Sequence, residues 1–166
     1  MLPDVSVVVP VFNEGKSIGT VLRLLSKIRL FPFKVEIIVV DDGSTDNSAA
    51  KIKAFPFVKY IRHSKNMGKG AALKTGFKNS AGRVIVIQDG DMEYSPELIP
   101  YLVSPILQDK SDVVFGSRFA GKQERMSLSH YMGNKMLSLT ARLLFGAPIT
   151  DIMTGSKAFS RSCQLV

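Results

Sequence analysis

The chain has 166 residues, of which 45% are hydrophobic and 22% charged, as is typical of one globular domain. Its formal net charge of +8 indicates an anionic partner. The single cysteine, Cys163, excludes an intrachain disulfide and a cysteine-rich zinc site. No apolar run is long enough to span a bilayer and the N-terminus lacks signal-peptide features, so we expect a cytoplasmic protein.

The first half of the chain alternates apolar runs with helical patterns. In chain order we predict a strand over Val5–Val11, a helix over Ser17–Ile28, a strand over Phe33–Val40, a short helix reaching about Ala54 and a strand over Val58–Arg62. The uninterrupted apolar strands are typical of a parallel sheet that is buried on both faces.

The alternation continues in the second half. We predict a helix over Gly68–Ser80, a strand over Val84–Gln88, a helix starting at Ser95-Pro96, a strand over Asp112–Phe115 and an amphipathic helix over Met126–Phe145. No element is assigned beyond Ile149. Strands that alternate with helices predict an α/β fold with a mostly parallel twisted sheet and helices on both faces.

Acidic side chains follow three of the predicted strands. Glu14 follows the first, Asp41 and Asp42 follow the second, and Asp89 and Asp91 follow the fourth. Right-handed crossovers place these strand ends on one edge, where open α/β sheets bind ligands. Two carboxylates separated by one glycine can share a hard divalent cation, although a polar turn is the simpler interpretation of that motif alone.

Two local alternatives are excluded by spacing. An EF-hand that starts at Asp89 requires glycine at its sixth position and glutamate at its twelfth, where this chain has Tyr94 and Pro100. The glycine-rich turn before the third helix lacks P-loop spacing. Its free amides and Lys69 are nevertheless placed to approach a phosphate, with a solvated helix start as the equal alternative.

Six motifs in order resemble family 2 glycosyltransferases of the GT-A fold, most closely the dolichol-phosphate mannosyltransferase-like branch. These motifs are VPVFNE (9–14), VVDDGSTDNS (39–48), NMGKGAALKTGF (66–77), IQDGDMEYSP (87–96), DVVFGSRF (112–119) and TDIMTGSKAF (150–159). The resemblance implies a single GT-A catalytic domain over residues 1–166 that stops short of the family's usual C-terminal extension.

The resemblance also implies a role for each matched position. Mg²⁺ or Mn²⁺ on the donor diphosphate would be held by Asp89, Asp91 and Glu93. The nucleotide pocket would be lined by Pro10, Phe12 and Glu14, and one of Asp41 and Asp42 would contact the base. Arg118 would bind phosphate, and Asp151 would lie near the acceptor, as a general base for a hydroxyl or as an orienting group for a phosphate.

We therefore expect an inverting enzyme that moves a hexose from a nucleotide-sugar of the GDP-mannose or UDP-glucose type to a polyprenyl phosphate, on the cytoplasmic face of a membrane. His130 and Asn134 stand where this branch often has Arg and Ser. Transfer to a sugar hydroxyl and non-catalytic nucleotide-sugar binding are the alternatives. Nucleic acid is not expected, because the basic region over 118–142 has few aromatic residues for base stacking.

The apolar stripe of the helix over 126–145 has two interpretations. We favour packing against the sheet. The alternative is a helix that lies peripherally on a membrane beside the lipid acceptor.

Overall fold

The computed structural model describes residues 2–30, 32–117, 128–146, 150–151 and 154–164. Six strands form one sheet in the order β3-β2-β1-β4-β6-β5. The strands are β1 (Val5–Val11), β2 (Val35–Asp41), β3 (Val58–Arg62), β4 (Val84–Ile87), β5 (Val113–Phe115) and β6 (Lys157–Ser160). The first five strands fall where the sequence predicts them.

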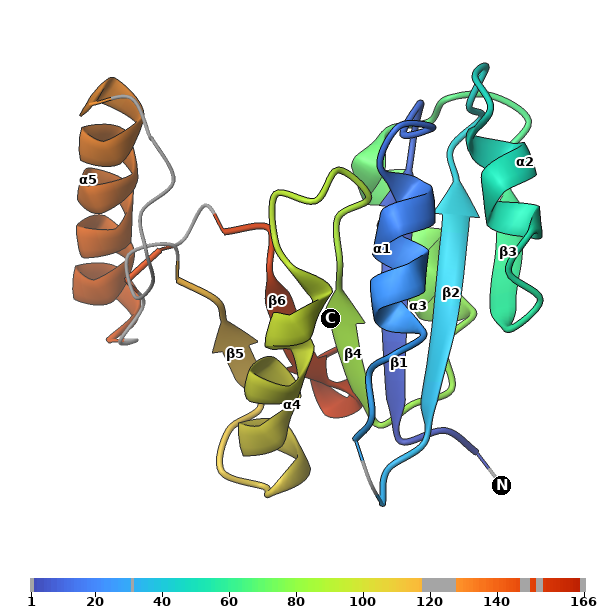
Figure 1. Cartoon of the computed structure of the whole chain (residues 1–166). Coiled ribbons are helices and arrows are strands. Elements are labelled where there is room, and N and C mark those ends of the chain that lie inside the picture. The colour runs from blue at the N-terminus through green and yellow to red at the C-terminus, as the bar shows by residue number, and fades with distance from the viewer. Residues whose placement is uncertain (1, 31, 118–127, 147–149, 152–153, 165–166) are drawn as a thin grey trace.

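Helices cover both faces of this sheet, as expected for an α/β fold (Figure 1). They are α1 (Ile18–Leu25), α2 (Ser48–Lys53), α3 (Lys69–Lys78), α4 (Ile99–Leu107) and α5 (Leu128–Phe145), with short 3₁₀ turns η1 (Pro96–Leu98) and η3 (Arg161–Gln164). The side chain of Ser95 accepts a bond from the amide of Glu97, so the predicted cap before α4 is present.

The core explains why β1 is central. All seven residues of β1 are buried, and Val5, Val7, Val9 and Val11 pack into a large cluster with α1 and α4. On the other face α3 lies against β1 and β2, and Ala72 packs with Ile38 and Val40. A strand that is apolar at successive positions satisfies both layers, which is the physical basis of the predicted buried strand.

β6 lies in the stretch where the sequence gives no prediction. It pairs antiparallel with both β4 and β5, with Lys157 opposite both Ile87 and Phe115. Because β6 runs against its neighbours, its first residue lies beside their carboxyl ends. The residues just before β6 are therefore carried to the edge where β4 delivers Asp89.

The favoured interpretation of the last predicted helix is wrong. In Figure 1, α5 stands clear of the sheet, and its apolar residues Met132, Met136, Leu139, Leu143 and Leu144 are all more than half exposed. Its buried face is instead formed by Asn134, Ser138 and Ala141, which recur at helical spacing. Within the described part of the chain no helix is long and apolar enough to cross a membrane.

Candidate functional site

The carboxyl edge of the sheet carries a cleft of about 290 Å³. It is lined from four segments: the end of β1, the turn after β2, the loop before α3 and the turn after β4. Seven of the site residues expected from the sequence line it together: Pro10, Phe12, Glu14, Asp42, Lys69, Asp89 and Asp91. The predicted convergence of acidic strand ends is therefore present in the structure.

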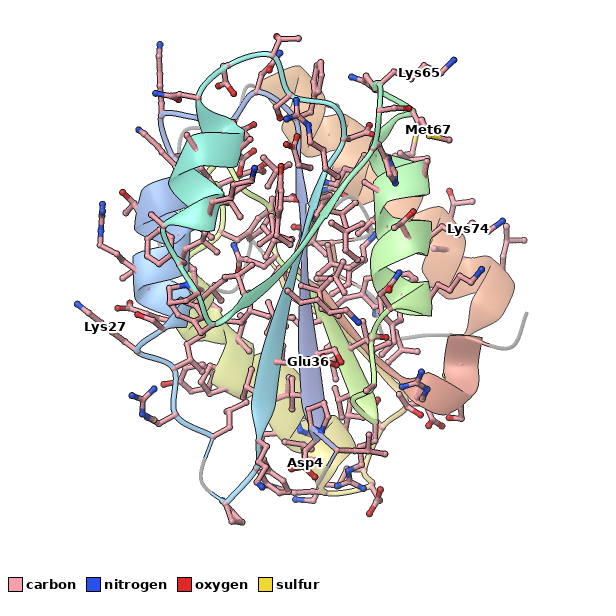
Figure 2. All side chains as sticks on the ribbon, turned by 90° about the vertical axis from the view of Figure 1, so that its right-hand side faces the viewer. Asp4, Lys27, Glu36, Lys65, Met67 and Lys74 are labelled. Atoms are coloured by element: carbon pink, nitrogen blue, oxygen red, sulfur yellow. The ribbon has the colours of Figure 1, made fainter. Side chains whose placement is uncertain are left out.

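Figure 2 shows which edge this is. Lys65 and Met67, in the loop before α3, lie at the opposite end of the molecule from Asp4, which immediately precedes β1. β1, β2 and β4 all run in the same direction. Each of these strands consequently ends at the cleft.

Asp42 organises the wall of the cleft next to α3. Its carboxylate is buried and accepts hydrogen bonds from Nδ1 of His63 at 2.7 Å and from the backbone amides of Met67 and Gly68, the latter at 2.7 Å. Burial alone would raise the pKa of Asp42, but these hydrogen bonds and the His63 ring outweigh it and hold that pKa below its ordinary value. The ionised carboxylate thus fixes the loop that leads into α3.

His63 connects this carboxylate to α3. Its Nδ1 donates to Asp42, since an ionised carboxylate can only accept, and its Nε2 lies 2.9 Å from the hydroxyl of Thr75. Both ring nitrogens are therefore within hydrogen-bond distance of a partner. Its structural role was not evident from the sequence, because Asp42, His63 and Thr75 belong to three separate elements.

Asp41 lies beneath the cleft and does not line it. It is fully buried, and it accepts hydrogen bonds from the amide of Ser44 at 2.8 Å and the hydroxyl of Tyr60 at 2.7 Å, with Arg62 at 3.4 Å. Burial and then the bond to Asp41 raise the pKa of Tyr60 to about 12. Of the two aspartates expected near the base, only Asp42 reaches the cleft, and protein donors already occupy its carboxylate.

The turn that closes β2 also depends on Gly43, whose φ is +75°. A Cβ built on Gly43 would lie 2.5 Å from the backbone carbon of Lys65. The turn after β2 and the loop before α3 therefore touch backbone to backbone, which only glycine allows in this conformation. Asn13 adds a further tie, because its side-chain oxygen accepts from the amide of Thr45 at 2.8 Å.

The acidic turn after β4 has one sheltered and one exposed carboxylate. Asp89 is 8% exposed, and its Oδ1 lies 2.6 Å from Nζ of Lys69. Asp91 is exposed and accepts a bond from the amide of Glu93 at 2.9 Å. Met92, which follows Asp91, has a φ of 69°, in the left-handed region that is uncommon for residues other than glycine.

The chemistry of this turn suits a divalent cation that also binds a substrate. Asp89 and Asp91 open into the same cleft, and both offer the oxygen ligands that Mg²⁺ and Mn²⁺ prefer. Among the described residues, however, no three His, Cys, Asp or Glu side chains gather into a metal-binding group. The expected set of Asp89, Asp91 and Glu93 therefore does not form such a group in the described part of the chain.

Asp151 is brought to α5 and not to the cleft. It is buried, and its Oδ1 accepts a 2.7 Å bond from Nδ2 of Asn134, whose Oδ1 in turn accepts from Ser138. The hydroxyl of Thr150 donates to Ser117 at 2.9 Å, which ties the segment before β6 to the end of β5. Arg118, which was also expected in the site, lies outside the described residues. The side chain of His130 is likewise not described.

Gly155 is a site residue that the sequence analysis missed. A Cβ at this position would lie 2.4 Å from Oδ2 of Asp89, so the backbone before β6 packs directly on that carboxylate. The glycine in TDIMTG was the available signal. Its meaning depends on the antiparallel placement of β6, which the sequence pattern did not reveal.

A second hollow, of about 330 Å³, lies at the opposite edge of the sheet between Arg83, Asp109 and Arg161. It is slightly larger than the cleft. Its two guanidinium groups already donate to backbone carbonyls, Arg83 to Leu107 and Arg161 to Ser80 and Gly82. Size alone does not make it a functional site, and the convergent chemistry lies in the other cleft.

A model of the family described as "Glycosyl transferase family 2" matches residues 6–163. This chain belongs to glycosyl transferase family 2. Four of the six motifs contribute residues that line the cleft. The fold is the α/β arrangement expected for this family.

Relatives and solved structures agree with this assignment. A UDP-N-acetylglucosamine–dolichyl-phosphate N-acetylglucosaminyltransferase of Methanococcus voltae is 32% identical over 96% of this chain and 70% of its own length. A dolichol-phosphate mannosyltransferase of Pyrococcus furiosus is 35% identical over 84% of this chain and 40% of its own length.

Glucosyl-3-phosphoglycerate synthase of Mycobacterium tuberculosis, solved with Mn²⁺ and UDP-glucose, superposes with a TM-score of 0.76 at 26% identity, covering 96% of this chain and 57% of that one. The chain spans between 40% and 70% of the length of eight curated relatives that it matches. The family model covers residues 6–163 of this chain, and all the residues that line its cleft fall within that range.

We predict that His63→Ala destabilises the protein by about 1–3 kcal/mol, because it removes one donor from the buried carboxylate of Asp42. The measurement is urea denaturation at neutral pH. Ser64→Ala, an exposed neighbour, is the control and should stay within about 0.5 kcal/mol of the parent. An unchanged midpoint for His63→Ala would contradict the role of this bond.

The acid limb of the same experiment reports on Asp42. Because its folded pKa lies below the ordinary value of 3.8, its stabilising contribution is complete above that pH and is lost as the pH falls through the lower folded value. Asp42→Asn should therefore be less stable than the parent at neutral pH, and the gap between the two should narrow on acidification below about pH 4.

Proposed function

We propose that this chain is a metal-dependent, inverting glycosyltransferase that moves a hexose from a nucleotide-sugar to a polyprenyl phosphate. The observation that carries the proposal is the charge of the cleft. Four carboxylates and one lysine are the charged residues lining it. A diphosphate is repelled by such a surface unless a cation accompanies it, so the cleft suits a metal–nucleotide complex better than a free anion.

Asp89 and Asp91 are the residues that would hold the cation, with diphosphate oxygens and water completing its ligands. The bound cation would neutralise the charge that develops on the departing nucleoside diphosphate. Glu93 would not be one of the two direct protein ligands of the cation. In support, the structural relative is solved with Mn²⁺ and UDP-glucose and also with Mg²⁺ and UDP.

The nucleoside would lie along the end of β1. Pro10, Phe12 and Glu14 line the cleft there, and the ring of Phe12 is 43% exposed and offers an apolar surface to a base. Asp42 would act on the nucleoside mainly by holding the loop over Asn66–Gly68, since its oxygens already bind three protein donors. Lys69, at the start of α3, would approach the phosphates, and Arg118, next to Ser117, is proposed as a second phosphate ligand.

Catalysis would rest mainly on positioning and charge stabilisation. A polyprenyl phosphate is largely ionised at neutral pH, because the second pKa of a phosphate monoester is about 6, and it needs no general base. The names of the relatives from Methanococcus voltae and Pyrococcus furiosus support a lipid-phosphate acceptor. The proposed donor is a nucleotide-sugar of the GDP-mannose or UDP-glucose type.

The alternative acceptor, a sugar hydroxyl, needs a general base, and Asp151 is the candidate. Its burial and its bond to Asn134 favour an orienting role instead. Non-catalytic nucleotide-sugar binding is the remaining alternative and is excluded by any metal-dependent transfer or hydrolysis of the donor.

We predict that Mn²⁺ and the correct nucleotide-sugar together raise the thermal midpoint, whereas the nucleotide-sugar alone does not, because ligands stabilise by mass action only when they bind the native state. A panel of GDP- and UDP-sugars with and without Mn²⁺ measures this. Asp91→Asn should weaken donor affinity at saturating Mn²⁺ by roughly tenfold or more, the scale of one lost bond to a charged group. Asp109→Asn, at the other edge, is the control, and nucleotide binding that ignores Mn²⁺ would refute the metal-dependent proposal.

Replacing Asp151 by Asn separates the two acceptors. If Asp151 only orients, kcat should fall by less than about tenfold, whereas loss of a general base typically costs about 10²–10⁴-fold. Turnover with a short polyprenyl phosphate measures this. A loss of three orders of magnitude at constant donor affinity would favour the hydroxyl acceptor.

A lipid acceptor also requires access to a membrane. The exposed face of α5 combines Met132, Met136, Leu139 and Leu143 at helical spacing with basic residues nearby, and we propose that it lies on an anionic bilayer. The double variant Met136→Glu/Leu143→Glu should lower binding to anionic vesicles by at least about tenfold, since each buried apolar side chain contributes about 1.5–3 kcal/mol. Tyr101→Glu, an exposed site on α4, is the control in the co-sedimentation assay.

A further inference from the structure

The ion pair between Lys69 and Asp89 occupies the centre of the cleft. Nζ of Lys69 lies 2.6 Å from Oδ1 of Asp89, the Lys69 side chain is 56% exposed and the Asp89 side chain 11% exposed. Lys69 is the first residue of α3, directly after Gly68, whose amide is bound by Asp42. The lysine is therefore delivered to Asp89 by a fixed loop, with its flexible stem facing the solvent.

The other carboxylate oxygen of Asp89, Oδ2, is covered by the protein backbone. A Cβ on Gly155 would lie 2.4 Å from Oδ2, so the backbone before β6 packs against that atom. The carboxylate thus presents Oδ1 to the cleft, and Lys69 covers it. A divalent cation that reaches Asp89 must displace the ammonium or share the oxygen with a like charge, which is unfavourable.

The cleft offers the displaced ammonium few other partners. Glu14, Asp42 and Asp91 are the other carboxylates that line it, and Asp42 already binds His63 and two amides. Lys69 is the single basic side chain among the described residues of the lining. A nucleoside diphosphate that arrives with the cation brings new anionic oxygens into reach of the lysine's four-carbon stem.

We propose that Lys69 is an exchangeable internal counter-ion of Asp89. In the empty cleft it neutralises Asp89 and opposes the binding of a divalent cation alone. When a nucleoside diphosphate binds together with the cation, the cation would replace the Lys69 ammonium as the partner of Asp89. Lys69 would then pair with a phosphate oxygen of the nucleotide. No covalent bond is made or broken, and Asp89 has a cationic partner throughout.

The consequence is that metal and nucleotide bind cooperatively. By linkage, the factor by which the nucleotide tightens the cation equals the factor by which the cation tightens the nucleotide. The inference rests on the proposed function, since it takes a nucleoside diphosphate as the ligand of the cleft. It adds that Lys69 couples the binding of the cation to the binding of the nucleotide, which a phosphate-binding lysine alone would not do.

The test is Lys69→Met in the full chain, with two binding measurements. Mn²⁺ alone is titrated by the loss of its free EPR signal, and GDP and UDP are titrated calorimetrically at saturating Mn²⁺. The variant should bind Mn²⁺ alone roughly tenfold more tightly and the nucleoside diphosphate roughly tenfold more weakly, each being the scale of one bond between charged groups. The two changes have opposite signs, which a folding defect does not produce.

Lys74→Met is the matched control, because Lys74 lies on the same helix but points away from the sheet in Figure 2. It should leave both affinities unchanged, whereas Lys69→Arg should retain both within a few-fold and Lys69→Gln should repeat the Lys69→Met pattern. Unchanged or weaker binding of Mn²⁺ alone to Lys69→Met overturns the exchange. If the parent protein binds neither GDP nor UDP with Mn²⁺, the proposed function fails. The Mn²⁺ affinities of the parent and of Lys69→Met, measured without nucleotide, still decide whether Lys69 opposes cation binding at Asp89.

Discussion

The cleft depends on the direction in which the central strands pair. β1 pairs in parallel with β2 on one side and β4 on the other, so three separate segments end at the same edge. The strands are mostly apolar, and the acidic residues that line the cleft come after the strands end. The pairing thus brings together acidic residues that are about 30 to 80 positions apart along the chain.

Two further contacts turn this edge into a defined site. The ionised carboxylate of Asp42 holds the amides of Met67 and Gly68 and so fixes the start of α3. The antiparallel β6 brings Gly155 against Asp89. One contact places Lys69 and the other limits how Asp89 can be approached, and together they position the ion pair between these two residues.

The electrostatics of the site support the proposed cation-dependent binding of an anion. Carboxylates dominate the lining although the whole chain is basic, with a formal net charge of +8. The excess positive charge therefore lies elsewhere on the molecule, and α5 combines part of it with an exposed apolar face. The proposed binding of a metal-bound nucleotide beside an anionic membrane would use these two properties in different places.

Most strands and helices of the α/β fold and the acidic strand ends could be predicted from the sequence, because apolar periodicity and turn residues are local signals. Five strands and the convergence of Glu14, Asp42, Asp89 and Asp91 followed from it. Only the tertiary structure decided that Asp41 lies beneath the cleft, that His63 supports Asp42, that β6 inserts antiparallel and that the apolar face of α5 is exposed. These features arise from contacts between residues distant in sequence, and the hydrophobic pattern of one segment does not specify which other segment will cover it.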